Sequence, residues 1–416
     1  MLLKNHHSRY TITVMSVQKI GLFSAHSFAK FGGVQNHVIA LYKEFSKRGI
    51  AAKIIVPGNA HAMPRGIPEE DIITIGVSFY IPANQSRAEF SVSVRRRFRE
   101  RIWRENFDVL HFHNLGMGPL SYQILRHANS LNILTVHFTS EGSKLSQIPI
   151  AKQLIKRFYE PKFYGVIAVS PAALEAIADF GGFKNGPVKI IPNGIDLSRF
   201  SYESATMTSP HPRQNLLFVG RFEKRKGLVH LLRAFSFLVE EGRKNLRLII
   251  VGEGEQRQTA QDFILKYNLS SYINFSGKVN DSALPNFYKK ADVFCASAVA
   301  GESFGMTLLE AMACGTPIAG FANSGYSYVM QGHEKAVGEN LLAKPGDSNA
   351  LAQKIALLID NKDIYERARQ WGLKRARKFA WPKIADQVLN FYEEAHVWKK
   401  KAIDTRRMSI TRSLTN

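Results

Sequence analysis

Short apolar runs alternate with amphipathic helical patterns along almost the whole chain. Each run is rich in β-branched residues and is closed by a polar or turn residue. This alternation is typical of parallel sheets covered by helices, so the sequence predicts an α/β protein with doubly wound, Rossmann-like sheets. The predicted strands span residues 19–24, 51–57, 108–113, 132–137, 165–170 and 188–192 in the first half, and 215–220, 246–252, 272–277, 292–297 and 317–321 in the second.

The alternation of strand and helix patterns stops between Phe200 and Asn215, where the chain is polar and contains two prolines. We therefore expect a linker at 201–214 between an N-terminal domain at 15–200 and a C-terminal domain at 215–380. A helix at 381–400 is expected to pack back toward the first domain. Residues 1–14 are expected to form a disordered extension. The basic tail at 401–416 is also expected to be disordered, because it has little apolar surface to bury.

The bulk composition agrees with two ordinary domains and points to a reducing compartment. The 416 residues include 45% apolar and 22% charged side chains, enough for two buried cores. Cys295 and Cys314 are the two cysteines, and they have neither metal-ligand nor disulfide-framework spacing. No uninterrupted run of about 18 apolar residues occurs. A cytoplasmic location is expected.

The net charge of +22 calls for an anionic partner such as phospholipid, nucleic acid or a phosphorylated substrate. Residues 94–104 concentrate this charge in a predicted amphipathic helix in which Val94, Phe98 and Ile102 recur every fourth residue. Such a helix can dock on anionic lipid, although its apolar residues could instead pack on the sheet. The residues expected to bind the membrane are Arg95, Arg96, Arg97, Arg99, Arg101, Trp103 and Arg104.

Nucleic acid is a weaker candidate partner. No helix-turn-helix, zinc-finger or RNP-like aromatic pattern accompanies the basic residues. We therefore expect no nucleic-acid binding and a peripheral position on the cytoplasmic face of a membrane.

The segment at 301–317, GESFGMTLLEAMACGTP, is the most informative for chemistry. Glu302 and Glu310 lie eight positions apart, the first before a predicted helix and the second on it. A helix start presents free N–H groups and a positive dipole end, which suits a diphosphate, while nearby carboxylates can accept hydrogen bonds from sugar and ribose hydroxyls. The loop residues expected to hold the diphosphate are Phe304, Gly305, Met306 and Thr307.

Two further segments follow predicted strands. GRFEKRKG at 220–227 places Arg221 and Lys226 where doubly wound sheets open their ligand crevice. FGGVQNHV at 31–38 follows a strand and opens a helix, so Gly32 and Gly33 let the backbone approach an anion closely. His137 ends another predicted strand at the same kind of edge.

The 301–317 segment resembles the Glu-x7-Glu motif of glycosyltransferase family 4, and the resemblance extends from Gly21 to about Trp398. It implies a GT-B fold, with two Rossmann-like domains facing each other across a cleft, and sugar transfer that retains the anomeric configuration. In that family Glu302 would grip the donor sugar and Glu310 the nucleotide ribose. Arg221 and Lys226 would neutralise charge that develops on the leaving diphosphate, the Gly33 loop would face the donor phosphates, and His137 would position donor and acceptor.

The resemblance also implies a metal-free site, consistent with the absence of an Asp-x-Asp motif. The nucleotide-sugar would then be a co-substrate, with no cofactor. No residue stands out as a nucleophile. Same-face attack is therefore expected, with the departing phosphate accepting the proton of the acceptor hydroxyl.

The layout is most similar to phosphatidylinositol mannosyltransferases, through HSFAKFGGVQNHV, FDVLHFHNLGMGPLS, HFTSEGSK and VAGESFGMTLLEAMACGT. GDP-mannose is then the expected donor and an inositol lipid the expected acceptor, and Lys144 and Asp281 match expected substrate-binding positions. The chain departs from those enzymes at His26, Gly116 and Leu284, where they carry Tyr, Asn and Lys nearby.

These departures keep alternatives open. The acceptor could be a soluble glycan or a lipid-linked oligosaccharide, with a UDP-sugar as donor. A non-catalytic basic adaptor and a sugar-nucleotide epimerase on the same fold are further alternatives, because one fold hosts several chemistries.

Overall fold

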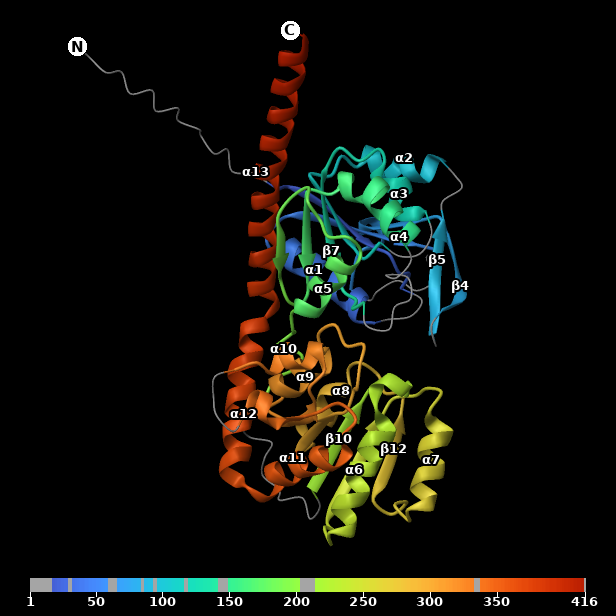
Figure 1. The fold of residues 1–416 in the computed structure, drawn as a ribbon, viewed down its shortest axis with the longest axis vertical. Helices are drawn as coiled ribbons and strands as arrows, with labels where there is room; N and C mark the ends of the chain where they lie inside the picture. The colour runs from blue at the N-terminus through green and yellow to red at the C-terminus, as the bar shows by residue number, and fades with distance from the viewer. Residues whose placement is uncertain are drawn as a thin grey trace, which may run out of the picture.

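The chain forms two α/β domains arranged one above the other (Figure 1). The computed structural model describes residues 17–28, 32–58, 66–83, 86–92, 96–115, 119–140, 149–202, 214–332 and 337–414. The extension expected at 1–14 lies outside the described residues, as does most of the linker expected at 201–214.

The N-terminal domain contains a seven-stranded parallel sheet in the order β3-β2-β1-β6-β7-β8-β9. Its strands are β1 (Lys19–Ser24), β2 (Ala51–Pro57), β3 (Ile72–Ile75), β6 (Val109–His113), β7 (Leu131–Val136), β8 (Gly165–Ala168) and β9 (Val188–Ile190). An antiparallel hairpin of β4 (Val77–Ala83) and β5 (Ser86–Val92) stands beside the sheet. The helical segments are α1 (Gly33–Lys47), η1 (Glu69–Asp71), α2 (Arg96–Arg104), α3 (Leu120–Leu125), α4 (Pro149–Leu154), the π turn η3 (Ile155–Tyr159), η4 (Glu160–Lys162) and α5 (Pro171–Asp179).

The C-terminal domain contains a six-stranded parallel sheet in the order β12-β11-β10-β13-β14-β15. Its strands are β10 (Gln214–Val219), β11 (Leu246–Val251), β12 (Ile273–Gly277), β13 (Val293–Ala296), β14 (Ile318–Phe321) and β15 (Leu342–Ala343). The helical segments are η6 (Lys224–Lys226), α6 (Leu228–Glu240), α7 (Arg257–Lys266), α8 (Leu284–Lys289), α9 (Met306–Ala313), α10 (Ser324–Met330), η7 (Gly338–Leu341), α11 (Ser348–Asp360), α12 (Lys362–Ala376) and η8 (Arg377–Phe379).

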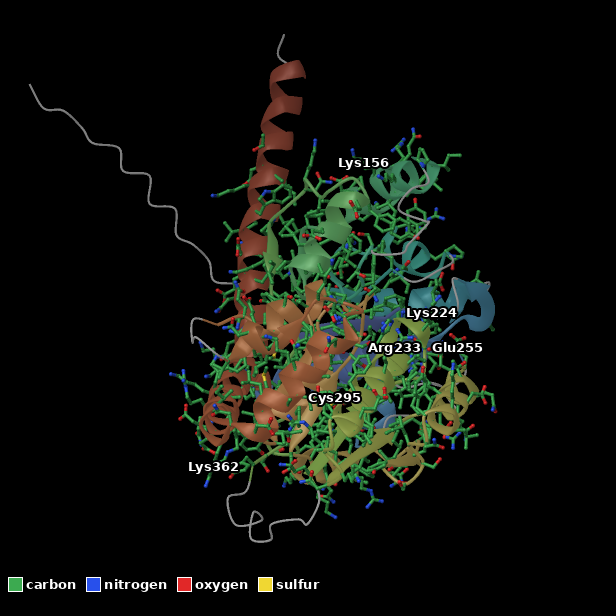
Figure 2. All side chains as sticks on the ribbon, turned by 60° about the horizontal axis from the view of Figure 1, so that its bottom comes forward. Lys156, Lys224, Arg233, Glu255, Cys295 and Lys362 are labelled. Atoms are coloured by element: carbon green, nitrogen blue, oxygen red, sulfur yellow. The ribbon has the colours of Figure 1, made fainter. Side chains whose placement is uncertain are left out.

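Apolar side chains fill both faces of the N-terminal sheet, which is why its strands read as continuous apolar runs. One cluster joins the sheet to α1 and to α13 (Trp381–Leu414), and includes Phe45, Phe391 and Tyr392. The other lies under α2, α3 and η3, and includes Ile102. In the C-terminal domain, Cys295 is buried on β13 in the middle of the domain (Figure 2).

The chain crosses back from the C-terminal domain through α13, which runs along the N-terminal domain (Figure 1). At the crossing, Ile195 donates its N–H to the carbonyl of Phe379 at 2.8 Å, and Trp381 donates to the carbonyl of Ile195 at 3.3 Å. Gly194 is required here because a β-carbon would lie 2.4 Å from the Trp381 ring. The two chain segments that connect the domains are therefore hydrogen-bonded to each other here. We call residues 193–200 at this point the hinge.

The disorder predicted for the tail at 401–416 was wrong for residues 401–414. The structure continues α13 as one helix to Leu414, and in Figure 1 its end projects beyond the N-terminal domain. The physical reason is helix propagation: the helix is already nucleated by packed residues, so each added residue gains a hydrogen bond without a new nucleation cost. Lys, Arg, Ala and Met also have good helix propensity.

Each sheet has one point at which the strand order reverses. In the N-terminal sheet it lies between β1 and β6, and in the C-terminal sheet between β10 and β13. Doubly wound sheets bind ligands beyond the carboxyl ends of the strands at such points. The segments that follow β1, β10 and β13 therefore define the candidate site.

Candidate active site

The loops after β10 and β13 pack tightly against each other. Gly227 has φ of 69°, and a β-carbon there would lie 1.9 Å from the carbonyl oxygen of Ser297. The Ser297 hydroxyl donates to the Lys226 carbonyl at 3.0 Å, and the Val299 N–H donates to the Arg225 carbonyl at 2.8 Å. Only glycine fits this approach, which fixes the basic loop against the loop that carries Glu302.

Two cations converge on one oxygen of Glu302. The Lys226 Nζ lies 2.5 Å from Glu302 Oε1, and the Arg225 Nη1 lies 3.0 Å from the same atom. Glu302 is only 9% exposed, so the two cations compensate the charge of a buried carboxylate. Both cations contact the Oε1 atom. The structure thus brings two predicted site residues, Lys226 and Glu302, into contact and adds Arg225; the ion pairs themselves were not predicted.

Arg221 stands apart from this cluster. Its side chain is 68% exposed, and its Nη1 pairs with Glu223 Oε1 at 2.8 Å. Glu223 Oε2 accepts a second ion pair from Arg225 at 2.8 Å. A short ion-pair chain therefore runs from Arg221 through Glu223 and Arg225 to Glu302, and the Arg221 guanidinium is the solvent-facing end of it.

The start of α9 has the form expected for an anion-binding turn. Gly305 precedes the helix with φ of 106°, and its missing side chain leaves room for Tyr326, whose ring would lie 2.7 Å from a β-carbon. Phe304 is 2% exposed and contacts Tyr328 and Phe379. Phe304 therefore anchors the turn by packing, while the backbone at Met306 and Thr307 carries the positive end of the helix dipole.

Glu310 lies one turn further along α9. Its Oε2 accepts a hydrogen bond from the buried Tyr288 hydroxyl at 2.7 Å. Burial raises the pKa of Glu310 to about 7, and Asp281 adds to the rise, whereas Tyr288 and Arg199 lower it. Arg199 also hydrogen-bonds the Asp281 backbone carbonyl. The structure therefore places the predicted Asp281 and Glu310 in one electrostatic neighbourhood.

On the N-terminal side, α1 opens at the predicted glycine pair. Gly32 is the helix cap in an extended conformation, and among the described residues no atom lies within 4 Å of a β-carbon placed on Gly33. The described residues therefore leave space beside the first turn of α1. His37, one turn later, is buried and donates its Nδ1–H to Asn193 Oδ1 at 2.8 Å.

His137 lies in a cluster of imidazoles at the ends of β6 and β7. Its ring Nε2 is 3.1 Å from His113 Nδ1, and its ring lies 4.7 Å from the His37 ring. Its backbone N–H donates to Asn114 Oδ1 at 2.9 Å. His111, deeper in the sheet, bonds the Tyr392 hydroxyl at 2.7 Å and lies 4.2 Å from His113. His137 is thus held by three surrounding groups, His113, Asn114 and His37.

The cluster is electrically neutral at ordinary pH. Burial lowers the pKa of His37 to about 4, and burial with the mutual repulsion of the rings holds the pKa values of His111, His113 and His137 well below their usual range. A neutral ring has one donor and one acceptor nitrogen. His137 can therefore orient substrate groups by hydrogen bonding without contributing charge.

One candidate metal-ligand group occurs among the described residues. The ligand atoms of His37, His113 and His137 lie within 4.8 Å of one another. The Nε2 atoms of His37 and His113 have no hydrogen-bond partner among the described atoms. Neutral imidazole is the form that binds metals, so this cluster is where a cation would bind.

A cleft of about 420 Å³ joins the two domains at the hinge. It is lined by α1 from Asn36 to Lys47, by the hinge at 193–200, by Met306 and Glu310 of α9, and by Trp381. His37 also lines it, so the imidazole cluster and the Glu310 side of the site share one cavity. Apart from the motifs, no feature of the sequence predicts that the imidazole cluster and Glu310 line the same cavity.

The predicted basic helix is present as α2. Arg101 and Arg104 are exposed, and Ile102 is buried. Trp103 is half-buried, its indole N–H donates to the Ile124 carbonyl at 3.4 Å, and its ring lies 4.7 Å from His127. The Trp103 ring therefore packs in part on α3, and its expected lipid contact stays a prediction.

Several predicted residues cannot be placed. Lys144 and Arg95 lie outside the described residues, as do the side chains of Arg96, Arg97 and Arg99. None of the described helices has the length and apolar character needed to cross a membrane.

The sequence reasoning missed Arg225, His37, His113 and Asn193. Arg225 lies within the basic motif and could have been considered with Lys226. His113 stands at the end of a predicted strand, as His137 does, and this position was a usable signal. Asn193 is 156 positions from His37, and no local pattern connects them.

Comparison with protein-family models divides the chain as the structure does. The model described as Glycosyltransferase Family 4 matches residues 31–199, and the model described as Glycosyl transferases group 1 matches residues 204–378. Among curated proteins, the phosphatidyl-myo-inositol mannosyltransferase of Mycobacterium leprae is 33% identical over 90% of this chain and 96% of its own length. Mannosylfructose-phosphate synthase of Agrobacterium fabrum is 32% identical over 55% of this chain and 52% of its own length.

Solved structures show the same fold. Sucrose-phosphate synthase from Thermosynechococcus elongatus superposes with a TM-score of 0.71 at 23% identity, covering 91% of this chain and 99% of its own. Anabaena HepE in complex with UDP superposes with a TM-score of 0.67 at 19% identity, covering 89% and 98%. The two doubly wound sheets and the cleft between them are therefore shared by these proteins.

Proposed function

The chain belongs to the retaining GT-B glycosyltransferases of family 4 and is a hexosyltransferase, and from this premise we propose that it transfers mannose from GDP-mannose to a phosphatidylinositol-type lipid. The observation that carries this choice of substrates is the 33% identity to a phosphatidyl-myo-inositol mannosyltransferase over 90% of this chain and 96% of that protein. A match of nearly full length includes the acceptor domain as well as the donor domain.

The C-terminal domain binds the donor in this proposal. Glu310 accepts hydrogen bonds from the ribose, and the α9 start holds the diphosphate with the α1 start at Gly33 opposite. Glu302 accepts hydrogen bonds from the sugar hydroxyls through Oε2, while its Oε1 pairs with Lys226 and Arg225. Carboxylates suit both tasks because, when ionised, they only accept hydrogen bonds.

Transfer proceeds by attack on the face from which the diphosphate leaves. The bond between the sugar C1 and the diphosphate oxygen breaks, the acceptor oxygen bonds C1, and the acceptor proton passes to the departing phosphate. Lys226 and Arg221 stabilise the charge that grows on that phosphate. Arg221 can reach it because its guanidinium is exposed, and His137 orients the reacting groups as a neutral ring.

The two cations make a metal unnecessary for this step. Because the imidazole cluster could hold a cation, the proposal is directly testable with a chelator. Transfer activity is expected to survive EDTA at a concentration that strips bound divalent ions. Loss of activity with EDTA and recovery with one metal would contradict a metal-free mechanism.

The acceptor side faces a membrane in this proposal, on the cytoplasmic face. The exposed Arg101 and Arg104 of α2 supply positive charge on the N-terminal domain, and each cation near an anionic surface contributes about 1 kcal/mol of attraction. Both cysteines are free and buried, which suits a reducing compartment.

A UDP-sugar is the second candidate donor, acting toward a glycan or a lipid-linked oligosaccharide. The departure at Leu284 favours it, because Leu284 begins α8 beside Asp281, where the inositol lipid enzymes carry a lysine. The departures at His26 and Gly116 concern the acceptor side and favour the alternative acceptor.

A thermal-shift panel of GDP, UDP and ADP, each with and without its sugar, separates the two donors. A ligand that binds only the folded state raises the unfolding midpoint. GDP-mannose is expected to give the largest shift. A larger shift with a UDP-sugar would replace the donor while leaving the fold and the site unchanged.

A further inference from the structure

An exposed apolar ridge runs along the helical segment formed by α4 and η3. The exposed fractions are 69% for Ile150, 49% for Leu154 and 41% for Phe158. These three residues are spaced by four positions and so lie along one side of the segment. They are three of the ten large apolar side chains that the described residues leave exposed.

The opposite side of the same segment is anchored to the domain. Tyr159 packs against the cluster under α2 and α3, and its ring lies 5.6 Å from the Tyr122 ring. These anchoring ring contacts come from Tyr159 and Phe158 of η3, whereas Ile150 and Leu154 lie exposed on α4. Leaving such apolar area in water is unfavourable, and a contiguous exposed patch marks an interaction surface.

Positive charge borders the ridge. Lys156 and Arg157 are exposed between Leu154 and Phe158, and residues 149–159 contain no acidic residue. Lys156 stands at the margin of the N-terminal domain, away from the part of the C-terminal domain that carries Cys295 and Lys362 (Figure 2). An apolar ridge with flanking cations is complementary to an anionic lipid surface.

The ridge belongs to the same layer as the basic helix α2. Contacts link α2 to α3, and α3 to η3, on one face of the sheet. Arg126 is exposed at the end of α3, between the other two. The layer thus carries exposed cations on all three of its elements, namely Arg101, Arg104, Arg126, Lys156 and Arg157.

We propose that the α2–α3–η3 layer is the membrane-docking face and that Ile150, Leu154 and Phe158 insert among the lipid acyl chains. This inference rests on the proposed lipid acceptor and deepens it. The cations draw the protein to anionic lipid, and the ridge supplies the apolar contact that electrostatic attraction lacks.

A site-directed fluorophore tests insertion directly. Cys295 and Cys314 are buried, so Ile150→Cys can be labelled selectively with the environment-sensitive dye NBD. Leu265→Cys on α7, where the native side chain is 68% exposed, is the matched control on the other domain. Vesicles of phosphatidylcholine and phosphatidylglycerol should brighten the dye at 150, and nitroxide-labelled acyl chains should quench it, with neither effect at 265.

Substitution gives the second readout. Ile150→Asp with Leu154→Asp should weaken vesicle binding at least roughly tenfold, since burial of each large apolar side chain is worth about a tenfold factor or more. Phe158 is left in place because its ring contacts Tyr122. Leu265→Asp should bind vesicles as the unaltered protein does, and all three proteins should share one melting temperature.

The outcomes separate this inference from the proposed function. Vesicle binding with an unresponsive dye at 150, or with no effect of the double substitution, would overturn the ridge while leaving the lipid acceptor standing. Failure of the unaltered protein to bind any vesicle would overturn both. A lipid-free dimer that the double substitution abolishes, with vesicle binding unchanged, would identify the ridge as a self-association surface instead.

Discussion

The two sides of the cleft are built from opposite electrostatics. On the donor side, Lys226 and Arg225 are fixed on the buried carboxylate of Glu302 by ion pairs of 2.5 and 3.0 Å. On the acceptor side, His137 and His113 form a buried network that carries no charge at ordinary pH. In the proposed reaction the donor side binds a charged diphosphate, whereas the acceptor side orients neutral hydroxyl groups. The two sides should respond differently to substitution and to pH.

Removing the Glu302 carboxylate should have the largest effect. In Glu302→Gln the amide cannot balance Lys226 and Arg225, and one strong acceptor for the sugar is lost. We expect kcat/KM to fall by about 10²–10³, similar to the loss of one charge-stabilising group in other active sites. Steady-state kinetics measures it.

Glu241→Gln is the matched control for this substitution. Glu241 follows α6 with a side chain that is 60% exposed, and it pairs only loosely with Arg243 at 3.6 Å. Its loss should leave kcat/KM unchanged. Equal activities of the two variants would contradict the role of Glu302.

Gly227→Ala tests how rigidly the donor loop is held. The new β-carbon would meet the Ser297 carbonyl at 1.9 Å, so the basic loop must shift away from Glu302. We expect a loss of unfolding free energy of about 2–3 kcal/mol together with a loss of transfer activity. Gly242→Ala shares the positive φ, at 92°, but has no atom within 4 Å. It should lose only about 1 kcal/mol and keep activity; equal losses would show that the loop contact is unimportant.

The buried histidines of the acceptor side should make the free energy of unfolding depend on pH. The folded pKa of His37 is about 4 against 6.5 in an unfolded chain, so the unfolded state binds more protons between these values. The free energy of unfolding should therefore fall as pH drops through this window, by about 1.4 kcal/mol per pH unit for each buried histidine.

Urea unfolding at pH 7 and pH 5 measures this slope. His37→Gln should lower the slope by the contribution of one histidine. His111, His113 and His137 should keep their own contributions to the slope. A stability that is flat between these two pH values would show that the cluster histidines bind as many protons in the folded protein as in the unfolded one.

Glu310 should give the smallest effect, a pH dependence of donor binding. Its pKa of about 7 means that the carboxylate loses its charge as pH falls below neutrality. The donor KM should therefore rise as pH drops through 7, by up to about tenfold per pH unit. Tyr288→Phe removes a hydrogen bond that lowers this pKa, so it should move the profile to higher pH. An unmoved profile would assign the titration to another group.

The sequence was sufficient for the central strands and for the donor motifs. Buried parallel strands are continuous apolar runs, and all the predicted strands are present within one or two residues. It did not reveal β3 (Ile72–Ile75), the hairpin of β4 and β5, or the two-residue β15. These lie at the sheet edges or beside the sheet, where pairing with a neighbour rather than a buried apolar run defines the strand.

The candidate site was likewise predictable from the sequence only in part. Lys226 and Glu302 could be predicted because each lies in a recognisable local motif. The bond between His37 and Asn193 and the exposure of the Ile150 ridge depend on how distant segments pack. The apolar residues of α4 and η3 have the same spacing as a buried helix face, so only the structure shows that they point outward.

Transfer of labelled sugar by the purified protein tests the central claim most directly. GDP-mannose and UDP-glucose are each supplied with phosphatidylinositol in vesicles, and the lipid product is isolated and its anomeric configuration determined. We expect a mannosylated inositol lipid, formed from GDP-mannose with retention and lost in Glu302→Gln. Transfer only from the UDP-sugar, or a product with inverted configuration, would contradict it.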